Sequence, residues 1–502
     1  MSGWGGGYVT DVEYTSGYYL AQSPHMMAVT CLMNGLAVDP PWHDPHLHYL
    51  ELGCGRGVNA CVLAASNPGW RVTAIDFNPG AIADARRLAQ AAGLDNVTFI
   101  EADLAGFAAT AAAAALPPVD AISMHGVWSW VGEPVRAGIK QLAAAKLRAG
   151  GMLHVSYIGL PAMQGALGMQ RLLREAGTRL AGRSDRQAVA GRGVVQALLA
   201  AEAAHLALPV ARELIERLDA LPVAYLAHEY MNASWTPFFH ADVASALAEA
   251  KLDYAGSARL HENFVDLMLS PAQRAVHDRF DDPLMRELVL DTCTNRTLRH
   301  DVYVRGATRI AAGVRDAALG DVTLALAVMP DEFTYKVEVP AGSGTLNPEF
   351  YGPVVRALAE RPRRVADLLA LPDLAGKRDN PSEMITMLAG TYRALIAQHL
   401  EQGASDRIRR YNAVIARRDV RLDGLNNPSA MASLRLGAGY PCRAVELFLV
   451  DRIGAAGGAI DPALLAAELD PSLSAQDSAT LAGVFANVLR DRLDVWRAMG
   501  LV

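Results

Sequence analysis

Short apolar runs alternate with helical patterns along residues 46–160. Runs at 46–52, 71–76, 97–103, 119–124 and 152–157 are typical of buried strands, and the stretches between them carry apolar residues at helical spacing. One helix is expected to begin at Asn78-Pro79, and another near Glu133-Pro134 with its end at Gly150-Gly151. This alternation predicts βαβ units and therefore an α/β fold with a parallel, doubly wound sheet.

The alternation stops after Pro161 for about sixty residues, in which apolar positions recur at helical spacing, as at 167–180 and 209–221. Strand character then returns at 252–260 and 299–305, after a predicted helix over 238–251. We therefore interpret residues 161–222 as a helical insertion and residues 223–306 as the region that completes the interrupted sheet. Because apolar helix stripes need a partner surface, we expect the insertion to pair two subunits as a homodimer.

The ends of the chain have their own patterns. Residues 1–45 form an N-terminal segment with a glycine-rich start over 1–7, an aromatic stretch at 14–19 and a short helix after Ser23-Pro24. Residues 307–502 are expected to be mainly helical, with helices around 354–371 and 382–402 that suit a winged-helix-like module. Residues 46–160 remain as the central doubly wound domain.

Composition narrows the class of protein. The 502 residues include 46 Lys and Arg against 53 Asp and Glu, a net charge of −7 that argues against a partner such as duplex nucleic acid. Five widely spaced cysteines, none in a C-x-x-C pair, favour neither a disulfide framework nor a zinc knuckle, so we expect no metal and a cytoplasmic location. No apolar run approaches the roughly 18 residues of a membrane span. A secretory leader begins with a positively charged region, whereas the first fifty residues here contain no Lys or Arg.

A glycine-rich turn follows the first predicted strand and opens a helix. It reads Glu51-Leu52-Gly53-Cys54-Gly55-Arg56-Gly57. Glycines let the backbone turn tightly and approach a ligand, while the following helix offers free N–H groups to an anion. Asp76 ends the second strand, where a carboxylate can accept hydrogen bonds from both ribose hydroxyls.

The spacing of these glycines is G-x-G-x-G, whereas dinucleotide-binding turns have G-x-G-x-x-G. The turn therefore resembles the S-adenosyl-L-methionine (AdoMet) site of class I methyltransferases. That resemblance implies that Asp103 holds the adenine amino group and Glu51 orients the methionine moiety. The full set of residues that we expect to bind the cofactor is Tyr18, Glu51, Gly53, Cys54, Gly55, Gly57, Asp76, Phe77, Asp103, Leu104 and His125.

Two tryptophans follow the fourth strand, in His125-Gly126-Val127-Trp128-Ser129-Trp130-Val131, where ligands of open α/β sheets bind. Such residues either pack in a core or line a pocket, and the position beside the glycine turn favours a pocket wall. Together with Y-T-S-G-Y-Y at 14–19, V-S-Y at 155–157, H-E-Y-M-N at 228–232 and D-T-C-T-N-R-T-L-R-H at 291–300, the segment resembles a group of bacterial methyltransferases. These carry a methyltransferase regulatory domain and include protein-lysine methyltransferases that act on outer-membrane proteins.

The resemblance implies methyl transfer from AdoMet to a protein side chain, most simply lysine. Candidate catalytic residues are His125, Trp128 and Tyr157, as pocket walls or proton acceptors. Residues 158–162 (I-G-L-P-A) depart from the N-T-x-P-G-W expected beside the acceptor, so the acceptor's identity stays open. Alternatives are a small-molecule methyltransferase and a non-catalytic AdoMet-binding scaffold. An NAD oxidoreductase ranks lowest because of the glycine spacing.

Overall fold

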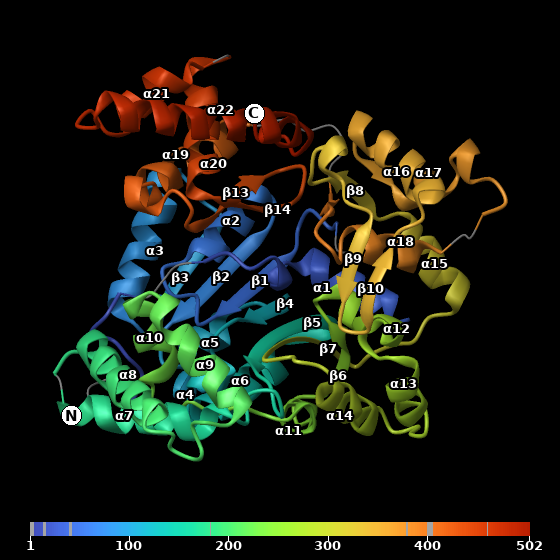
Figure 1. Ribbon diagram of the computed structural model, residues 1–502. Helices are drawn as coiled ribbons and strands as arrows, with labels where there is room; N and C mark the ends of the chain where they lie inside the picture. The colour runs from blue at the N-terminus through green and yellow to red at the C-terminus, as the bar shows by residue number, and fades with distance from the viewer. Residues whose placement is uncertain are drawn as a thin grey trace.

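The computed structural model describes residues 5–13, 17–39, 43–180, 182–377, 380–398, 405–458 and 460–502. A seven-stranded sheet in the order β3-β2-β1-β4-β5-β7-β6 lies at the centre (Figure 1). Its strands are β1 (His48–Leu52), β2 (Arg71–Asp76), β3 (Val97–Glu101), β4 (Val119–Met124), β5 (Leu147–Ile158), β6 (Leu252–Ser257) and β7 (Leu298–Arg305). In this sheet β7 runs antiparallel to both of its neighbours, β5 and β6, and the other described pairs are parallel. The predicted doubly wound sheet is confirmed, and the strands after the helical segment complete it.

Helices cover both faces of the sheet, which explains why its strands read as continuous apolar runs. In β1, Tyr49 packs with one hydrophobic cluster, while its neighbours Leu50 and Leu52 pack with the other. The first cluster includes residues of α1 (Pro24–Met33), α2 (Val58–Ser66) and α3 (Pro79–Ala92). The second includes residues of α4 (Leu104–Phe107), α5 (Ala111–Ala115), α6 (Glu133–Lys146) and α11 (His240–Ala248).

Local signals set most helix starts in this domain. The Asn78 side chain accepts hydrogen bonds from the N–H groups of Gly80 and Ala81 at 2.9 and 3.2 Å, so α3 begins where predicted. The end expected for α6 at Gly150-Gly151 is wrong, because α6 ends at Lys146 and both glycines lie within β5. Leu147 is buried and pairs with Val119 of β4, so strand pairing replaces the last helical turn.

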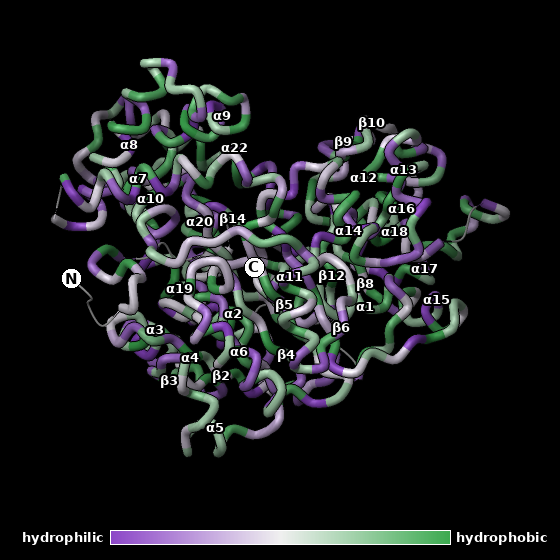
Figure 2. Tube along the Cα trace, turned by 90° about the horizontal axis from the view of Figure 1, so that it is seen from below, coloured by the Kyte–Doolittle hydropathy of each residue, from purple (hydrophilic) through white to green (hydrophobic). Residues whose placement is uncertain are grey.

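Residues 161–222 are mainly helical and contain α7 (Ala166–Leu180), α8 (Ser184–Ala200), α9 (Pro209–Arg217) and the 3-10 turn η3 (Leu218–Ala220). In Figure 2 these helices form a lobe set to one side, and hydrophobic positions recur along its outer trace. The chain then enters α10 (Val223–Tyr230), and α11 precedes β6. Three further helices follow β6, namely α12 (Val265–Met268), α13 (Pro271–His277) and α14 (Pro283–Cys293).

The C-terminal region holds helices and three small sheets. Its helices are α15 (Ala312–Gly320), α16 (Pro348–Glu360), α17 (Val365–Leu369), α18 (Pro381–Leu388), α19 (Asp406–Asp419), α20 (Ala444–Ala456), α21 (Pro462–Leu469) and α22 (Ala475–Ala498). Its strands are β8 (Thr323–Leu326), β9 (Lys336–Val339), β10 (Gly342–Thr345), β11 (Arg363–Arg364), β12 (Ala394–Ala397), β13 (Pro428–Ser433) and β14 (Ala438–Arg443).

Two helices expected there are wrong in extent. The first is divided into α16 and α17 by β11, and the second gives way after Leu388 to β12, while residues 399–402 lie outside the described chain. Both short strands pair with β8, so long-range pairing overrides a local pattern that a helix would also satisfy. The winged-helix-like assignment stays a prediction.

The hairpin β13–β14 docks on α2, on the face of the central sheet opposite α6 (Figure 1). The Asn67 side chain donates to the Gly437 carbonyl at 2.7 Å, and a Cβ added at Gly439 would lie 2.8 Å from Val62. The C-terminal region therefore braces the helix that follows the glycine turn. Within the described residues, no helix combines the length and the apolar character that crossing a bilayer requires.

Candidate active site

The glycine turn after β1 is held against β2 by its backbone. Gly53, Gly55 and Gly57 have φ of +71°, +50° and +73°, conformations that other residues rarely adopt. The N–H groups of Gly53 and Cys54 donate to the Ile75 carbonyl at 2.8 and 3.1 Å. A Cβ on Gly57 would lie 2.6 Å from that of Ala85, so the third glycine allows α2 to pack closely against α3.

The Asp76 carboxylate joins the turn to the end of β2. One oxygen accepts the Gly55 N–H at 2.8 Å and the other accepts the Asn78 N–H at 2.9 Å. Burial raises the pKa of Asp76, and the N–H donors of Asn78, Gly55 and Phe77 oppose that shift. Each carboxylate oxygen has a further lone pair, so this side chain can accept hydrogen bonds from a ligand as well.

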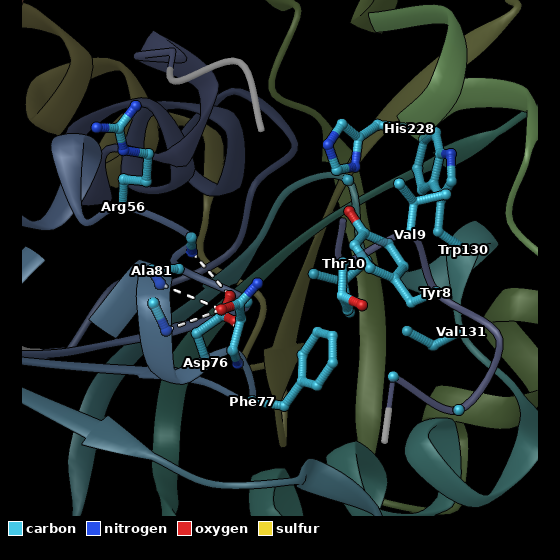
Figure 3. Close-up of a pocket in the computed structure, with 18 of the residues that line it drawn as sticks. Tyr8, Val9, Thr10, Arg56, Asp76, Phe77, Ala81, Trp130, Val131 and His228 are labelled. Carbon is cyan, nitrogen blue, oxygen red and sulfur yellow. Dashed lines mark hydrogen bonds between the residues drawn. The ribbon is translucent and has the colours of Figure 1, made fainter. Parts of the chain in front are cut away.

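A cavity of about 610 Å³ opens beside Asp76, within the usual range for small-molecule sites. It lies at the carboxyl ends of β1 and β4, where the strand order reverses and ligands of open α/β sheets bind. Figure 3 shows Asp76 and Phe77 on one side of it and Tyr8, His228 and Trp130 on the other. The cavity is thus enclosed by parts of the chain far apart in sequence.

The N-terminal segment covers this cavity. Residues 5–13 contribute much of its lining, and α10 with the loop after it holds them in place. The Val9 N–H donates to the Asn232 side chain at 2.8 Å, and His228 hydrogen-bonds the Val12 carbonyl at 3.0 Å. Glu13 forms an ion pair with Arg56 of the glycine turn at 3.1 Å. The H-E-Y-M-N segment therefore positions the cover of the site.

A smaller recess of about 50 Å³ shares Gly53, Gly55 and His125 with the main cavity and reaches Glu51. Glu51 is only 4% exposed, and its carboxylate accepts a hydrogen bond from the Asn59 amide at 3.2 Å. Burial raises the pKa of Glu51 to about 8, with the Asn59 hydrogen bond opposing the shift and the charge of Asp76 adding to it. An acid so placed favours a positively charged ligand group.

Aromatic rings line the side of the recess towards β4. Tyr19 stacks on His125 with ring centroids 3.6 Å apart, and His300 stacks behind His125 at 5.4 Å. Burial, with smaller contributions from His154 and Arg259, lowers the pKa of His125 to about 3. His125 is therefore neutral near pH 7 and a weak proton acceptor, which argues against the base role considered for it.

The structure places most of the expected cofactor residues around these two spaces. The larger cavity is lined by Gly53, Gly55, Asp76, Phe77, Asp103, Leu104 and His125, and the recess by Glu51, Cys54 and three of the same residues. Tyr18 and Gly57 line neither space. The Tyr18 hydroxyl instead accepts the Gly439 N–H at 2.9 Å, and its neighbour Tyr19 lines the recess. Of the aromatic stretch at 14–19, residues 14–16 lie outside the described chain.

Two of the three candidate catalytic residues lie away from both spaces. Trp128 is 1% exposed and packs in the core, whereas Trp130, two residues later, lines the cavity. The Tyr157 hydroxyl donates to Asp301 at 2.6 Å, inside a buried ionic network. The pocket-wall positions expected for Trp128 and Tyr157 are therefore wrong, because both side chains face packed interior.

This network gathers the D-T-C-T-N-R-T-L-R-H segment. Arg299, fully buried, pairs with Asp291, Asp301 and Glu287 at 2.7, 3.0 and 2.9 Å. Although burial opposes ionisation, Arg299 and hydrogen bonds from His240 and Tyr157 hold the pKa of Asp301 well below its usual range. The segment thus fixes β7 to α14 and α11, which is a structural task.

Several lining residues were not expected from sequence, notably Arg56 and Asn59. Glu229 lies beside the same aromatic wall and accepts a hydrogen bond from the Trp235 indole at 3.3 Å. An acid at the centre of an aromatic-rich stretch, with Tyr225, Tyr230 and Trp235 around it in sequence, was the signal available for it.

Comparison with known proteins gives two family matches. Residues 50–153 match a methyltransferase domain, and residues 222–305 match a predicted methyltransferase regulatory domain. An uncharacterized protein of Synechocystis, sll1526, is 32% identical over 399 residues, which cover 78% of this chain and 75% of that protein. An uncharacterized Rickettsia prowazekii protein, RP789, is 21% identical over 344 residues, 68% of this chain and 60% of that one.

Among solved structures, PKMT2 from Rickettsia typhi in complex with AdoHcy superimposes with a TM-score of 0.72 at 16% identity. The match covers 97% of this chain and 100% of that one. The shared fold thus includes the helical lobe and the C-terminal region as well as the central sheet.

Proposed function

Because the chain belongs to the AdoMet-dependent methyltransferases that carry a methyltransferase regulatory domain, we propose that it methylates a lysine side chain of a protein. AdoMet dependence follows from the family. The lysine acceptor is supported by the segments that resemble protein-lysine methyltransferases and by the aromatic and acidic character of the wall beside the cavity.

The residues at the site fit AdoMet, which supplies an electrophilic methyl group on a positively charged sulfur. Gly53 and Gly55 leave the turn without side chains, so backbone forms that part of the wall. Asp76 keeps lone pairs for ribose hydroxyls after its two backbone hydrogen bonds. Glu51, buried and without an ion pair among the described residues, suits the ammonium of the methionine moiety.

The adenine end follows from the same arrangement. Phe77 lies at the end of the cavity that Asp103 and Leu104 also line, and Tyr8 meets its ring edge-on at 5.7 Å. We assign to Phe77 and Leu104 the flat faces of the base, and to Asp103, which is exposed, its amino group. The observation that carries the function is this succession of Glu51, Asp76 and Asp103 along the strand ends, beside an aromatic wall.

On the acceptor side, the chain must hold a nucleophile in line with the methyl group and keep water away. Tyr19 and His125 line the recess and Trp130 lines the main cavity, and aromatic faces attract cations as well as packing against an alkyl chain. A small-molecule acceptor and a non-catalytic scaffold are the competing proposals.

Labelling of a cell lysate separates these proposals. Purified protein is incubated with the lysate and trideuteromethyl AdoMet, and mass spectrometry follows the label in proteins and in metabolites. Trideuteromethyl-lysine in proteins, absent when the Asp76→Ala variant is used, supports the proposed function. Label in metabolites alone would favour a small-molecule acceptor, and cofactor binding without any label would favour a scaffold.

We further propose that the helical lobe pairs two subunits. Its helices α7–α9 and the connections between them expose large apolar side chains, which are costly to leave in water. These are Leu167, Leu180, Val189, Leu198, Leu208 and Val210. Light scattering should give the mass of a dimer, and the mass of a monomer would contradict this proposal.

A further inference from the structure

Glu229 lies among aromatic side chains. Its carboxylate accepts hydrogen bonds from the indole N–H groups of Trp235, at 3.3 Å, and Trp130. Tyr230 packs against Trp235 with ring centroids 6.3 Å apart. Glu229 as a residue is partly buried, and its sequence neighbour His228 lines the main cavity.

Four tyrosines on three segments lie within electrostatic reach of Glu229. Burial, followed by the charge of Glu229, raises the pKa of Tyr19, Tyr225 and Tyr230. For Tyr8 the causes are burial, then Asp76, then Glu229. Among the described residues, these four phenols feel the charge of Glu229, and they stay neutral at working pH and so provide no positive charge.

No Lys, Arg or His among the described residues forms an ion pair with Glu229. Burial raises the pKa of Glu229 to about 7, and its two indole hydrogen bonds oppose the shift only in part. A carboxylate that is desolvated and has no counter-charge is costly unless it binds a proton or a cation. The surroundings of Glu229 thus have an unmet preference for positive charge.

The aromatic surroundings of Glu229 adjoin the place where methyl transfer would occur. Trp130, which hydrogen-bonds Glu229, lines the main cavity, and Tyr19, which feels its charge, lines the smaller recess beside Glu51 and stacks on His125. Glu229 therefore lies near one aromatic residue of each of the two spaces, Trp130 and Tyr19. A chain entering between these rings would reach its carboxylate.

We propose that Glu229 is the acceptor-binding carboxylate: it receives the ammonium of the substrate's lysine between Tyr19 and Trp130 and takes its proton. This inference rests on the proposed function and extends it to one side chain. In the proton step, an N–H bond of the ammonium breaks and leaves its electron pair on nitrogen, while an O–H bond forms on Glu229. The neutral amine then has the lone pair that methyl transfer requires.

Glu229 suits this step better than the other titratable groups on the wall. An acid–base group works best when its pKa lies near the operating pH, which holds for Glu229. The pKa of His125 lies far below that range, so His125 accepts a proton poorly. The pKa values of Tyr8 and Tyr19 lie above it, so these two residues stay protonated. The exchange of a charged pair for a neutral one is also favoured where water is excluded.

The test uses n-butylammonium as a mimic of the lysine side chain and 1-butanol as a neutral probe of the same length. Each is titrated into the AdoHcy-saturated full-length protein at pH 7.5, with tryptophan fluorescence and calorimetry as readouts. We expect Glu229→Gln to weaken n-butylammonium binding at least tenfold and to change 1-butanol and AdoHcy binding less than twofold. Glu229→Asp should restore part of the affinity for n-butylammonium.

Glu213→Gln is the matched control, because Glu213 is an exposed acid on α9 that pairs only with Arg217 among the described residues. It should behave as the parent protein does. Equal affinity of n-butylammonium for the parent protein and Glu229→Gln would overturn the proposal, as would failure of the parent protein to bind n-butylammonium. A purely structural Glu229 would not distinguish the two probes.

Turnover on poly-L-lysine separates this inference from the function beneath it. With the parent protein, the rate should rise through pH 7 as Glu229 ionises, and Glu229→Gln should lose that rise and recover activity towards pH 9.5 as free amine accumulates. If the parent protein methylates neither poly-L-lysine nor lysate proteins, the proposed function fails. If Glu229→Gln methylates poly-L-lysine with unchanged kcat, KM and pH profile, only the role of Glu229 fails.

Discussion

Replacing Asp76 with alanine tests the ribose contact on which the cofactor assignment depends. In the ligand-free protein the change removes the acceptor for two backbone N–H groups, those of Gly55 and Asn78. Both residues are partly exposed, so water can replace the carboxylate at small cost. The fold should therefore survive, and the effect should appear in ligand binding.

The expected loss follows from the hydrogen bonds to the ribose. A hydrogen bond to a charged group contributes about 1.5–3 kcal/mol, and two hydroxyls on one carboxylate give about 3–6 kcal/mol. At about 1.4 kcal/mol per tenfold change, AdoMet and AdoHcy should both bind about 10²- to 10⁴-fold more weakly to Asp76→Ala.

Calorimetry with AdoHcy and its 2′-deoxy analogue measures this coupling. The parent protein should bind the analogue more weakly than AdoHcy, whereas Asp76→Ala should bind the two equally, because the side chain that distinguishes them is gone. Affinity of the variant for AdoHcy within threefold of the parent's would refute the ribose assignment, as would continued discrimination between the two ligands.

Three other outcomes can be measured on the same protein. Burial raises the pKa of Glu51 to about 8, so the affinity for AdoHcy measured by calorimetry should rise up to tenfold per pH unit between pH 6 and 8. Glu51→Gln should remove this pH dependence. An affinity of the parent protein that does not change with pH would contradict the role of Glu51. Asp301→Asn should lower the free energy of unfolding in urea by about 3–5 kcal/mol at pH 7, since it leaves Arg299 short of a buried partner. Asp301 has a depressed pKa, so its stabilisation is present above about pH 4 and lost as the pH falls, and equal stabilities at pH 7 would refute the network's role. Leu180→Glu, at a side chain 64% exposed in the helical lobe, should reduce the mass in light scattering to that of a monomer, and Leu464→Glu on α21, 70% exposed, should not; an unchanged mass in Leu180→Glu would count against pairing through α7.

The sequence predicted the central sheet well because burial on both faces leaves an unambiguous apolar run for each strand. It was less informative where one short pattern suits two structures, as at Ala394–Ala397, which pairs with β8 instead of continuing a helix. Pairing of that kind depends on residues some seventy positions away, which no local pattern contains.

Among site residues, sequence reasoning succeeded where backbone chemistry dictates the residue and failed where only side-chain direction decides. Gly53, Gly55 and Asp76 are required by the turn itself, with φ values that favour glycine and N–H groups that need an acceptor. Neighbours in extended chain point to opposite sides, and so Tyr18 faces the C-terminal hairpin while Tyr19 faces the recess.

The tryptophans after β4 illustrate the same limit. Trp128 and Trp130 are equally apolar and lie on one 3-10 turn, η2 (Trp128–Trp130), yet only the second lines the cavity. In the sequence, Glu229 stands out only as part of the H-E-Y-M-N segment. Its aromatic surroundings come from segments that meet only in the folded chain.

A crystal structure of the protein with AdoHcy tests the central claim most directly. The account predicts the ligand's ribose hydroxyls on Asp76, its amino group towards Glu51 and its sulfur facing the wall formed by Tyr19 and Trp130. AdoHcy bound elsewhere, or bound here with its sulfur turned away from that wall, would contradict it.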